Sequence, residues 1–189
     1  QGIPHPCVMV HPSPPFGGLF IKEYNMEMDE LDLLYKTRLM LKEKGFVVLK
    51  EPVQEFYRNL FKFTGIGLGG LLNMAGKSAG QIAGKLLKEL ASGEDLSIDD
   101  FKKLLEAFLL ETGTVSEIKR WEVTDKGVIV GVKGSVFSAS QDSKKPMCIP
   151  LQGGFAGVME AFFGGKWSCK EIECESMGED TCTFEIRRE

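Results

Sequence analysis

The sequence predicts an α+β domain, an antiparallel sheet of about four strands with helices packed on it. Two observations support this prediction. Segments with helical spacing of apolar residues come first along the chain, and two pairs of β-like runs follow, separated by another helix. At 189 residues the chain is long enough to bury a core without disulfides. We divide it into residues 1–50 and a main domain of residues 51–189.

The N-terminal segment is rich in proline, because most of the eight prolines and both histidines fall within residues 1–16. Proline at this density argues against a helix. His5, Cys7 and His11 could form a metal cluster, but the prolines prevent their regular presentation. We therefore interpret this segment as an irregular tail.

The rest of the N-terminal part contains one amphipathic helix between two short strands. Gly18–Tyr24 and Phe46–Lys50 have strand-like composition. Asp29–Lys44 has helical spacing of its leucines, acidic residues in its first turn and a glycine after its end. Residues 1–50 are a candidate dimerisation layer, and packing onto the core of the same chain is the alternative.

A glycine-rich stretch follows a predicted helix at Val53–Phe63. Gly65, Gly67 and Gly70 satisfy the letters of a dinucleotide-binding fingerprint, G-x-G-x-x-G. That motif needs a buried strand before it and an acidic residue at the end of a second strand. The preceding segment is helical in pattern, so we favour a flexible linker over a nucleotide site.

The remaining elements follow in a regular order. A glycine recurs every four residues in the next helix, at Gly76, Gly80 and Gly84, which leaves one face bare. The later predicted helices are Asp99–Glu111 and Pro150–Phe163. The predicted strands are Val115–Val123, Gly127–Ser138, Lys166–Glu175 and Thr181–Arg187.

Four of the five cysteines lie in the last forty-two residues. Cys174 and Cys182 flank a polar turn at Gly178, so we expect them to face each other near a hairpin tip. An odd number of cysteines in a chain with no signal peptide favours thiols and metal over disulfides. Thiolates with a carboxylate nearby are what a tetrahedral zinc site needs.

This closing segment resembles the 4-vinyl reductase domain family. The matching features are Cys148 before a helix opened by proline and glycine, then Glu171-Ile-Glu-Cys174, Gly178 and Cys182-Thr-Phe. The family includes aromatic-sensing domains of phenol- and xylene-responsive activators, a bacteriochlorophyll-synthesis protein and, more distantly, subunits of a vesicle-tethering complex. The resemblance implies a small, commonly dimeric ligand-binding domain. It also implies a zinc ion held by Cys148, Glu171, Cys174 and Cys182.

The resemblance raises one geometric question, because residues 171 and 174 point to opposite faces of a regular strand. Both reach one metal only if a bulge intervenes or the strand ends at Glu173. Cys169 shares its parity with Glu171 and is the alternative ligand. The competing interpretation of the whole group is a set of reduced thiols that hold no metal.

A cavity for a flat apolar ligand is expected between the glycine helix, the sheet and the Pro150–Phe163 helix. We select Trp121, Phe137 and Phe155 as its candidate lining residues. The sensor branch of the family recognises a phenolic hydroxyl with a histidine and a tryptophan. Both histidines here lie in the proline-rich tail, so recognition in that form is not expected.

Composition narrows the function further. A net charge of −4 gives no reason to expect nucleic acid as a partner, and no apolar run reaches the length of a membrane span. We expect a cytoplasmic homodimer that binds a small hydrophobic or aromatic molecule as sensor or carrier. Structural zinc would stabilise it, and no catalytic residue is assigned. The alternatives are a component of a vinyl-group reductase acting on a tetrapyrrole-like substrate, and a scaffold subunit.

Overall fold

The structure is a computed structural model that describes residues 30–64, 67–91, 96–138 and 142–189. The proline-rich tail and the strand predicted at Gly18–Tyr24 lie outside these residues. No helix within the described ranges is long and apolar enough to cross a membrane. The helices are α1 (Glu30–Lys44), α2 (Lys50–Thr64), α3 (Leu68–Leu90), α4 (Ile98–Glu111) and α5 (Ile149–Phe163).

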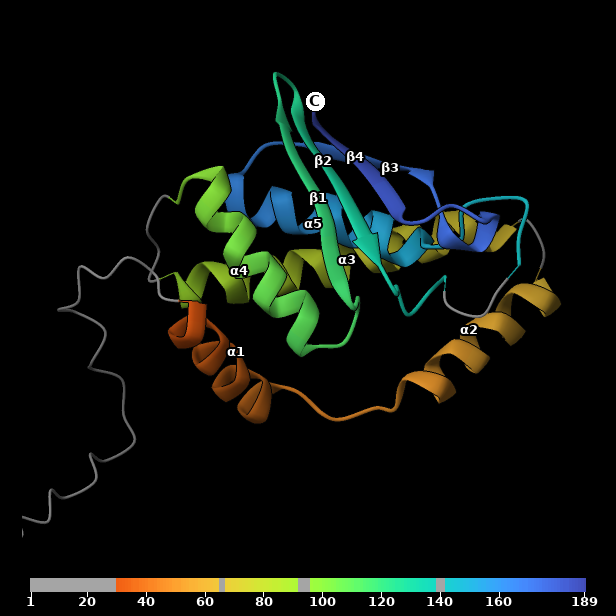
Figure 1. The fold of residues 1–189 in the computed structure, drawn as a ribbon, viewed down its shortest axis with the longest axis horizontal. Coiled ribbons are helices and arrows are strands. Elements are labelled where there is room, and N and C mark those ends of the chain that lie inside the picture. The colour runs from red at the N-terminus through yellow and green to blue at the C-terminus, as the bar shows by residue number, and fades with distance from the viewer. Residues whose placement is uncertain (1–29, 65–66, 92–95, 139–141) are drawn as a thin grey trace, which may run out of the picture.

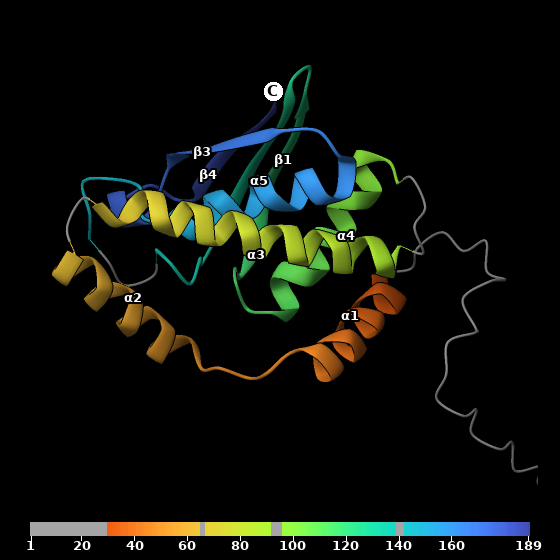
Figure 2. The ribbon, with the colours of Figure 1, turned by 180° about the vertical axis from the view of Figure 1, so that it is seen from behind.

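Four strands form one antiparallel sheet with the order β1-β2-β4-β3. Their bounds are β1 (Glu117–Thr124), β2 (Gly127–Lys133), β3 (Trp167–Glu173) and β4 (Cys182–Arg188). The helices lie on one side of this sheet (Figures 1 and 2). The predicted α+β class, with a sheet of four strands and helices packed on it, is therefore confirmed.

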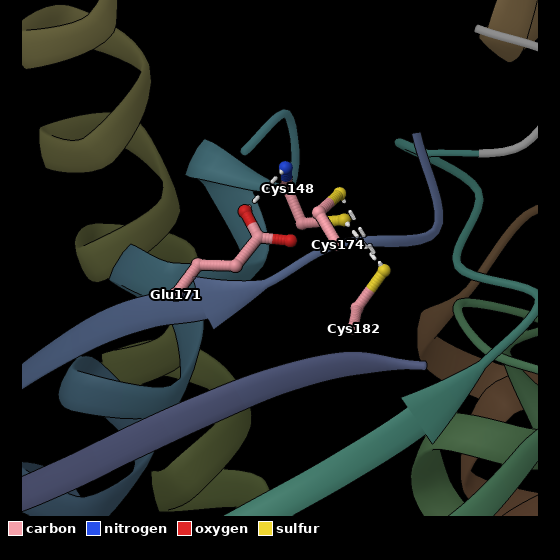
Figure 3. A group of neighbouring side chains, drawn as sticks. All are labelled: Cys148, Glu171, Cys174 and Cys182. Carbon is pink, nitrogen blue, oxygen red and sulfur yellow. Dashed lines mark hydrogen bonds between the residues drawn. The ribbon is translucent and has the colours of Figure 1, made fainter. Parts of the chain in front are cut away.

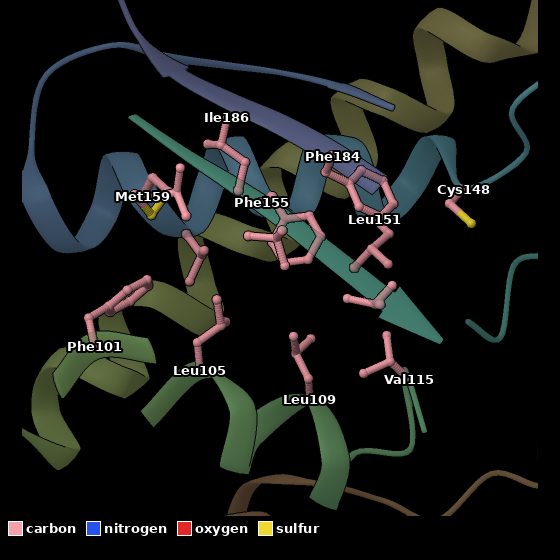
Figure 4. Packing of buried hydrophobic residues seen from close by; sticks show 14 of the residues in the cluster. Phe101, Leu105, Leu109, Val115, Cys148, Leu151, Phe155, Met159, Phe184 and Ile186 are labelled. Atoms are coloured by element: carbon pink, nitrogen blue, oxygen red, sulfur yellow. The ribbon is translucent and has the colours of Figure 1, made fainter. Parts of the chain in front are cut away.

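The core lies between the sheet and the helices. Valines at alternate positions of β2 (Val128, Val130 and Val132) are buried, as period-2 alternation in a strand requires. Figure 4 shows Leu105 and Leu109 of α4 pointing toward the ring of Phe155 on α5. The Phe155 ring packs edge-on against Phe184 of β4. The core therefore joins α4, α5 and the sheet in one cluster, and α3 covers the outer side of α5.

Helices α3 and α5 lie unusually close because glycines face the partner backbone. A Cβ atom at Gly76 would lie 2.1 Å from the carbonyl oxygen of Pro150, and one at Gly80 would lie 2.1 Å from that of Gly154. The arrangement is reciprocal, since a Cβ at Gly157 would lie 2.0 Å from the Lys77 oxygen. Real Cβ atoms do not approach carbonyl oxygens this closely, so this spacing requires glycine. The bare face predicted for the glycine helix is thus the α3–α5 interface.

The strand predicted at Phe46–Lys50 is wrong. Residues 45–49 form neither helix nor strand, and α2 already begins at Lys50. A strand needs a hydrogen-bonding neighbour, and β1 and β3 at the sheet edges pair only with β2 and β4 among the described residues. The segment instead links α1 and α2 below the rest of the fold (Figures 1 and 2). Its side chains are exposed, with Phe46 at 89% and Val47 at 94%.

Strand β2 is shorter than its predicted range, Gly127–Ser138. It ends at Lys133 because Gly134 has φ of +65°, which breaks the extended backbone. The next residues form a turn that carries Ser135, Phe137 and Ser138 toward α5.

Candidate metal centre and adjoining cavity

Three cysteines and one glutamate meet at one end of the sheet (Figure 3). Cys148 precedes the first residue of α5, Cys182 begins β4, and Cys174 follows β3, which carries Glu171. All four residues are buried, and their ligand atoms lie within 4.8 Å of one another. The structure therefore brings together the four residues that the sequence selected, as a group that could hold a metal ion.

The sulfur spacing matches that of a tetrahedral site. The Sγ atom of Cys182 lies 3.6 Å from that of Cys148 and 3.7 Å from that of Cys174. Two sulfurs bound at 2.3 Å to one tetrahedral zinc are separated by about 3.8 Å. A disulfide would instead hold them at about 2.0 Å. The three thiols are therefore spaced as ligands around one ion.

A bulge in β3 solves the parity problem. Glu171 pairs with Phe184 and Glu173 pairs with Thr183, so the intervening Ile172 is an extra residue on β3. The bulge brings the side chains of Glu171 and Cys174 to the same group. Cys169 pairs with Ile186 in the regular part of the strand and lies outside the group of four.

The Glu171 carboxylate is only half satisfied by the protein. Its Oε2 accepts a hydrogen bond of 2.8 Å from the Cys148 backbone N–H, while its Oε1 is buried with no hydrogen-bond partner. Burial raises the pKa of Glu171 above the ordinary carboxyl value. A buried acceptor without a partner is costly, and a cation bound at Oε1 would satisfy it. The donor set of the group therefore fits a metal ion.

The thiols differ in their protonation. Hydrogen bonds from Cys148 and Cys182 lower the pKa of the Cys174 thiol far below its usual value, so this residue carries the thiolate. Hydrogen bonds to Cys174 and Cys182, together with burial, raise the pKa of Cys148. One sulfur thus accepts from its neighbours, as expected of thiols gathered without an ion. A metal would replace the protons that they share.

Residues that the sequence did not single out support the group. The Oγ of Ser135 lies 3.3 Å from the Cys148 sulfur, and the Oγ of Ser176 lies 3.1 Å from that of Cys174. The backbone N–H of Glu175 donates to the Cys182 sulfur at 3.4 Å. The only sequence signal was local, since Glu175 and Ser176 directly follow Cys174. Ser135 is brought in by the fold.

The Glu175 carboxylate fixes the turn after β2. Its oxygens accept hydrogen bonds of 3.0 Å from the Gly134 backbone N–H and of 3.0 Å from the Ser138 hydroxyl. Because Glu175 also contacts Cys182, this carboxylate connects the sulfur group to the turn that carries Phe137.

A partly open cavity of about 240 Å³ lies between α3, α4 and α5. Its wall is mostly apolar, because α3 contributes glycine and alanine while α4 and α5 contribute mainly large apolar side chains. The lining residues are Gly76, Ala79, Gly80, Ala83, Leu105, Phe108, Leu109, Thr114, Phe137, Pro150, Leu151, Gly154, Phe155 and Val158.

Two of the three aromatic residues selected from the sequence line this cavity. Phe155 enters it from α5 and Phe137 from the turn after β2. Trp121 is not among the lining residues, and its ring centroid lies 6.4 Å from that of Phe101. The sheet was expected to form one wall, but α4 takes this place with three apolar side chains. This difference arises because α4 contacts β1 and turns its apolar face toward α5 (Figure 4).

The fold and the site together define an α+β domain with a candidate metal centre beside an apolar cavity. Residues 128–188 match the family model of the 4-vinyl reductase domain, so the chain carries a domain of this family. This agrees with the resemblance drawn from the sequence, which extended further toward the N-terminus. No curated protein sequence matched the chain significantly.

Three solved structures share the fold at low sequence identity. The phenol-responsive sensory domain of the transcription activator PoxR, crystallised with phenol, has a TM-score of 0.67 at 16% identity, with 86% of this chain and 92% of that chain covered. A vinyl-4-reductase family protein from Methanocaldococcus jannaschii has a TM-score of 0.53 at 16% identity (88% and 99% covered). Subunit 3 of a trafficking protein particle complex from Naegleria fowleri, covalently bound to palmitic acid, has a TM-score of 0.55 at 12% identity (82% and 96% covered).

Proposed function

We propose that this chain is a zinc-stabilised module that binds a small hydrophobic or aromatic molecule and acts as a sensor or carrier. The observation that carries the proposal is the position of α5. This helix starts at Cys148 of the sulfur group, and its next residues, Pro150, Leu151, Gly154 and Phe155, line the apolar cavity. A metal that fixes Cys148 would thereby also fix one wall of the cavity. The binding of phenol by the related PoxR domain is consistent with this use of the fold.

The donor set supports zinc in a structural role. Thiolate sulfur and carboxylate oxygen are both zinc ligands, and four protein ligands close a tetrahedral site. Three thiolates and one carboxylate would carry four negative charges against the two positive charges of the ion. Such an ion is a poor Lewis acid. When bound, it would join the start of α5 to the β3–β4 turn and add its binding free energy to folding.

The cavity favours a small ligand over a tetrapyrrole. A cavity of roughly 150 Å³ accepts benzene, and pockets for drug-sized ligands hold roughly 300–1,000 Å³. At about 240 Å³ this cavity suits a ligand of one or two rings. Its lining side chains include no acid, base or thiol, which supports binding rather than catalysis.

We further propose that the protein is a homodimer in which the α1–α2 linker takes part in the interface. Phe46, Val47, Val48 and Leu49 form four consecutive exposed apolar residues. Exposed apolar surface of this kind marks interaction sites in stable proteins. This assigns the dimerisation role expected for residues 1–50 to a particular segment.

One preparation of the protein, purified without chelator, tests the proposal. We expect one zinc per chain by elemental analysis, and an increase in melting temperature of a few degrees with a saturating one-ring aromatic compound. A long-chain fatty acid serves as the size control and should give no shift. Protein without stoichiometric zinc, or without response to any one-ring compound, would contradict the proposal.

A further inference from the structure

We propose that Thr114 supplies the cavity with a single hydrogen-bond acceptor, so that the preferred ligand is an uncharged apolar molecule with one hydrogen-bond donor. The ligand class includes phenols, anilines and similar ring compounds with an O–H or N–H group. The inference rests on the proposed binding function and adds the chemistry that selects among small apolar ligands.

Thr114 is the one residue with a polar side chain among those that line the cavity. The others are glycine, alanine, proline, leucine, valine or phenylalanine. Any side-chain hydrogen bond between the cavity wall and a ligand therefore involves the Thr114 hydroxyl.

The direction of that hydrogen bond is set by Thr112, at the end of α4. The Thr112 Oγ1 lies 2.8 Å from the carbonyl oxygen of Phe108 and 3.2 Å from that of Leu109. Carbonyl oxygens only accept, so the single Thr112 hydroxyl proton points to them. The Thr112 and Thr114 Oγ1 atoms lie 2.8 Å apart. Since the Thr112 proton is already used, Thr114 must be the donor in this contact.

The backbone of Thr114 has no remaining capacity that a ligand could use. Its N–H donates to the Leu109 oxygen at 3.0 Å, and its carbonyl accepts from the Val136 N–H at 3.0 Å. With its hydroxyl proton given to Thr112, Thr114 retains only the lone pairs of Oγ1. The residue can therefore accept a hydrogen bond from a ligand but cannot donate one.

This polarity separates otherwise similar ligands. A phenol or aniline can donate to Thr114, whereas an ether, a ketone or a plain hydrocarbon cannot. A carboxylate would bring a negative charge next to an acceptor in an apolar cavity, without a donor to stabilise it. The cavity should therefore select against acids of similar size.

Binding of phenol, toluene, anisole and benzoate to the zinc-loaded protein, measured by calorimetry, tests the inference. The comparison is made for each compound between wild type and Thr114→Val, which cancels the different hydration of the compounds. Loss of the hydroxyl should weaken phenol binding by about two- to tenfold. It should leave toluene and anisole binding unchanged or slightly stronger. Thr114→Ser keeps the acceptor and should retain the preference for phenol.

Thr112→Val is the second arm, because it removes the acceptor that holds the Thr114 proton. The Thr114 hydroxyl can then donate, so anisole should bind about two- to tenfold more tightly than to wild type, and the preference for phenol should narrow. A merely structural role of this pair would weaken all compounds alike. Circular dichroism and zinc content verify that each variant is folded.

The outcomes separate this inference from the proposed function. If toluene and phenol both bind but neither threonine substitution changes their ratio, the acceptor role is wrong and the binding function stands. If no one-ring compound binds the folded, zinc-loaded protein, the binding function fails and this inference fails with it.

Discussion

The Tyr57 hydroxyl of α2 donates a hydrogen bond of 2.6 Å to the carbonyl of Met147, the residue directly before Cys148. The same ring packs edge-on against Phe137, with 5.2 Å between ring centroids. Tyr57 therefore contacts both the segment that enters the sulfur group and a wall of the cavity. Its hydroxyl is buried, and burial raises the pKa of Tyr57, so the group remains a neutral donor.

Tyr57→Phe should lower the free energy of unfolding by about 1–3 kcal/mol, because the buried Met147 carbonyl loses its donor. Tyr35→Phe, at an exposed position of α1, is the matched control and should change stability little. Urea unfolding of both variants measures the difference. Equal unfolding free energies would show that the Tyr57 hydroxyl does not stabilise the start of α5.

Replacing Cys148, Cys174 or Cys182 by serine should each abolish stoichiometric zinc and lower the melting temperature. Each change removes a thiolate, and a neutral hydroxyl is a much weaker zinc ligand. Cys169→Ser is the matched control, because Cys169 lies on β3 two residues before Glu171 but outside the group. Zinc content and thermal melting are measured together. Zinc loss in Cys169→Ser would return that residue to the ligand set.

Zinc affinity should fall as the pH is lowered. Hydrogen bonds and burial raise the pKa of Cys148, and burial raises the pKa of Glu171, so both groups hold protons that the metal must displace. Because protons and zinc compete for the same atoms, acidification favours the proton-bound, metal-free form. Competition against a chromophoric chelator between about pH 8 and pH 6 measures the change. An affinity that does not weaken on acidification would contradict these ligands.

Val47→Asp should convert the proposed homodimer to a monomer, because it places a charge in the exposed apolar linker. Val123→Asp is the matched control: Val123 is also exposed, but it lies on the edge strand β1. Light scattering after size-exclusion chromatography gives the mass of each variant. A monomeric wild type, or a Val47→Asp variant that remains dimeric, would exclude the linker as the interface.

Gly80→Ala should destabilise the fold by about 1–3 kcal/mol or more, since its Cβ would lie 2.1 Å from the Gly154 carbonyl oxygen. Gly70→Ala, on the same helix with no atom near the added Cβ, should instead stabilise by up to about 1 kcal/mol through helix propensity. Opposite signs in chemical unfolding are expected. Two stabilising changes would show that α3 and α5 can separate without cost.

The sequence predicted the fold class and the residues of the candidate metal centre because the relevant signals are local. Cys174 and Cys182 are joined by a short hairpin, so their approach follows from the turn between them. The bulge at Ile172 was required by parity, but its presence depends on the pairing of β3 with β4. Ser135 could not be found in advance, because only the tertiary fold places it beside Cys148.

The errors have equally specific causes. Phe46–Lys50 has strand-forming side chains, but pairing partners decide whether a strand forms, and β propensity alone does not reveal them. Trp121 was chosen for the cavity because it is aromatic and lies on a strand beside the core. The wall is instead built by α4, and the sequence does not specify which helix closes a gap between others.

The glycines between α3 and α5 have a consequence for how relatives of this protein could diversify. On that side the cavity is bounded by main chain, and enlarging Gly76 or Gly80 would push the two helices apart rather than reshape the chamber. New ligand preferences are therefore most readily acquired through Leu105, Phe108 and Leu109 on the opposite side. Evolution of specificity in this architecture is expected to be one-sided, with a fixed floor and an adjustable roof.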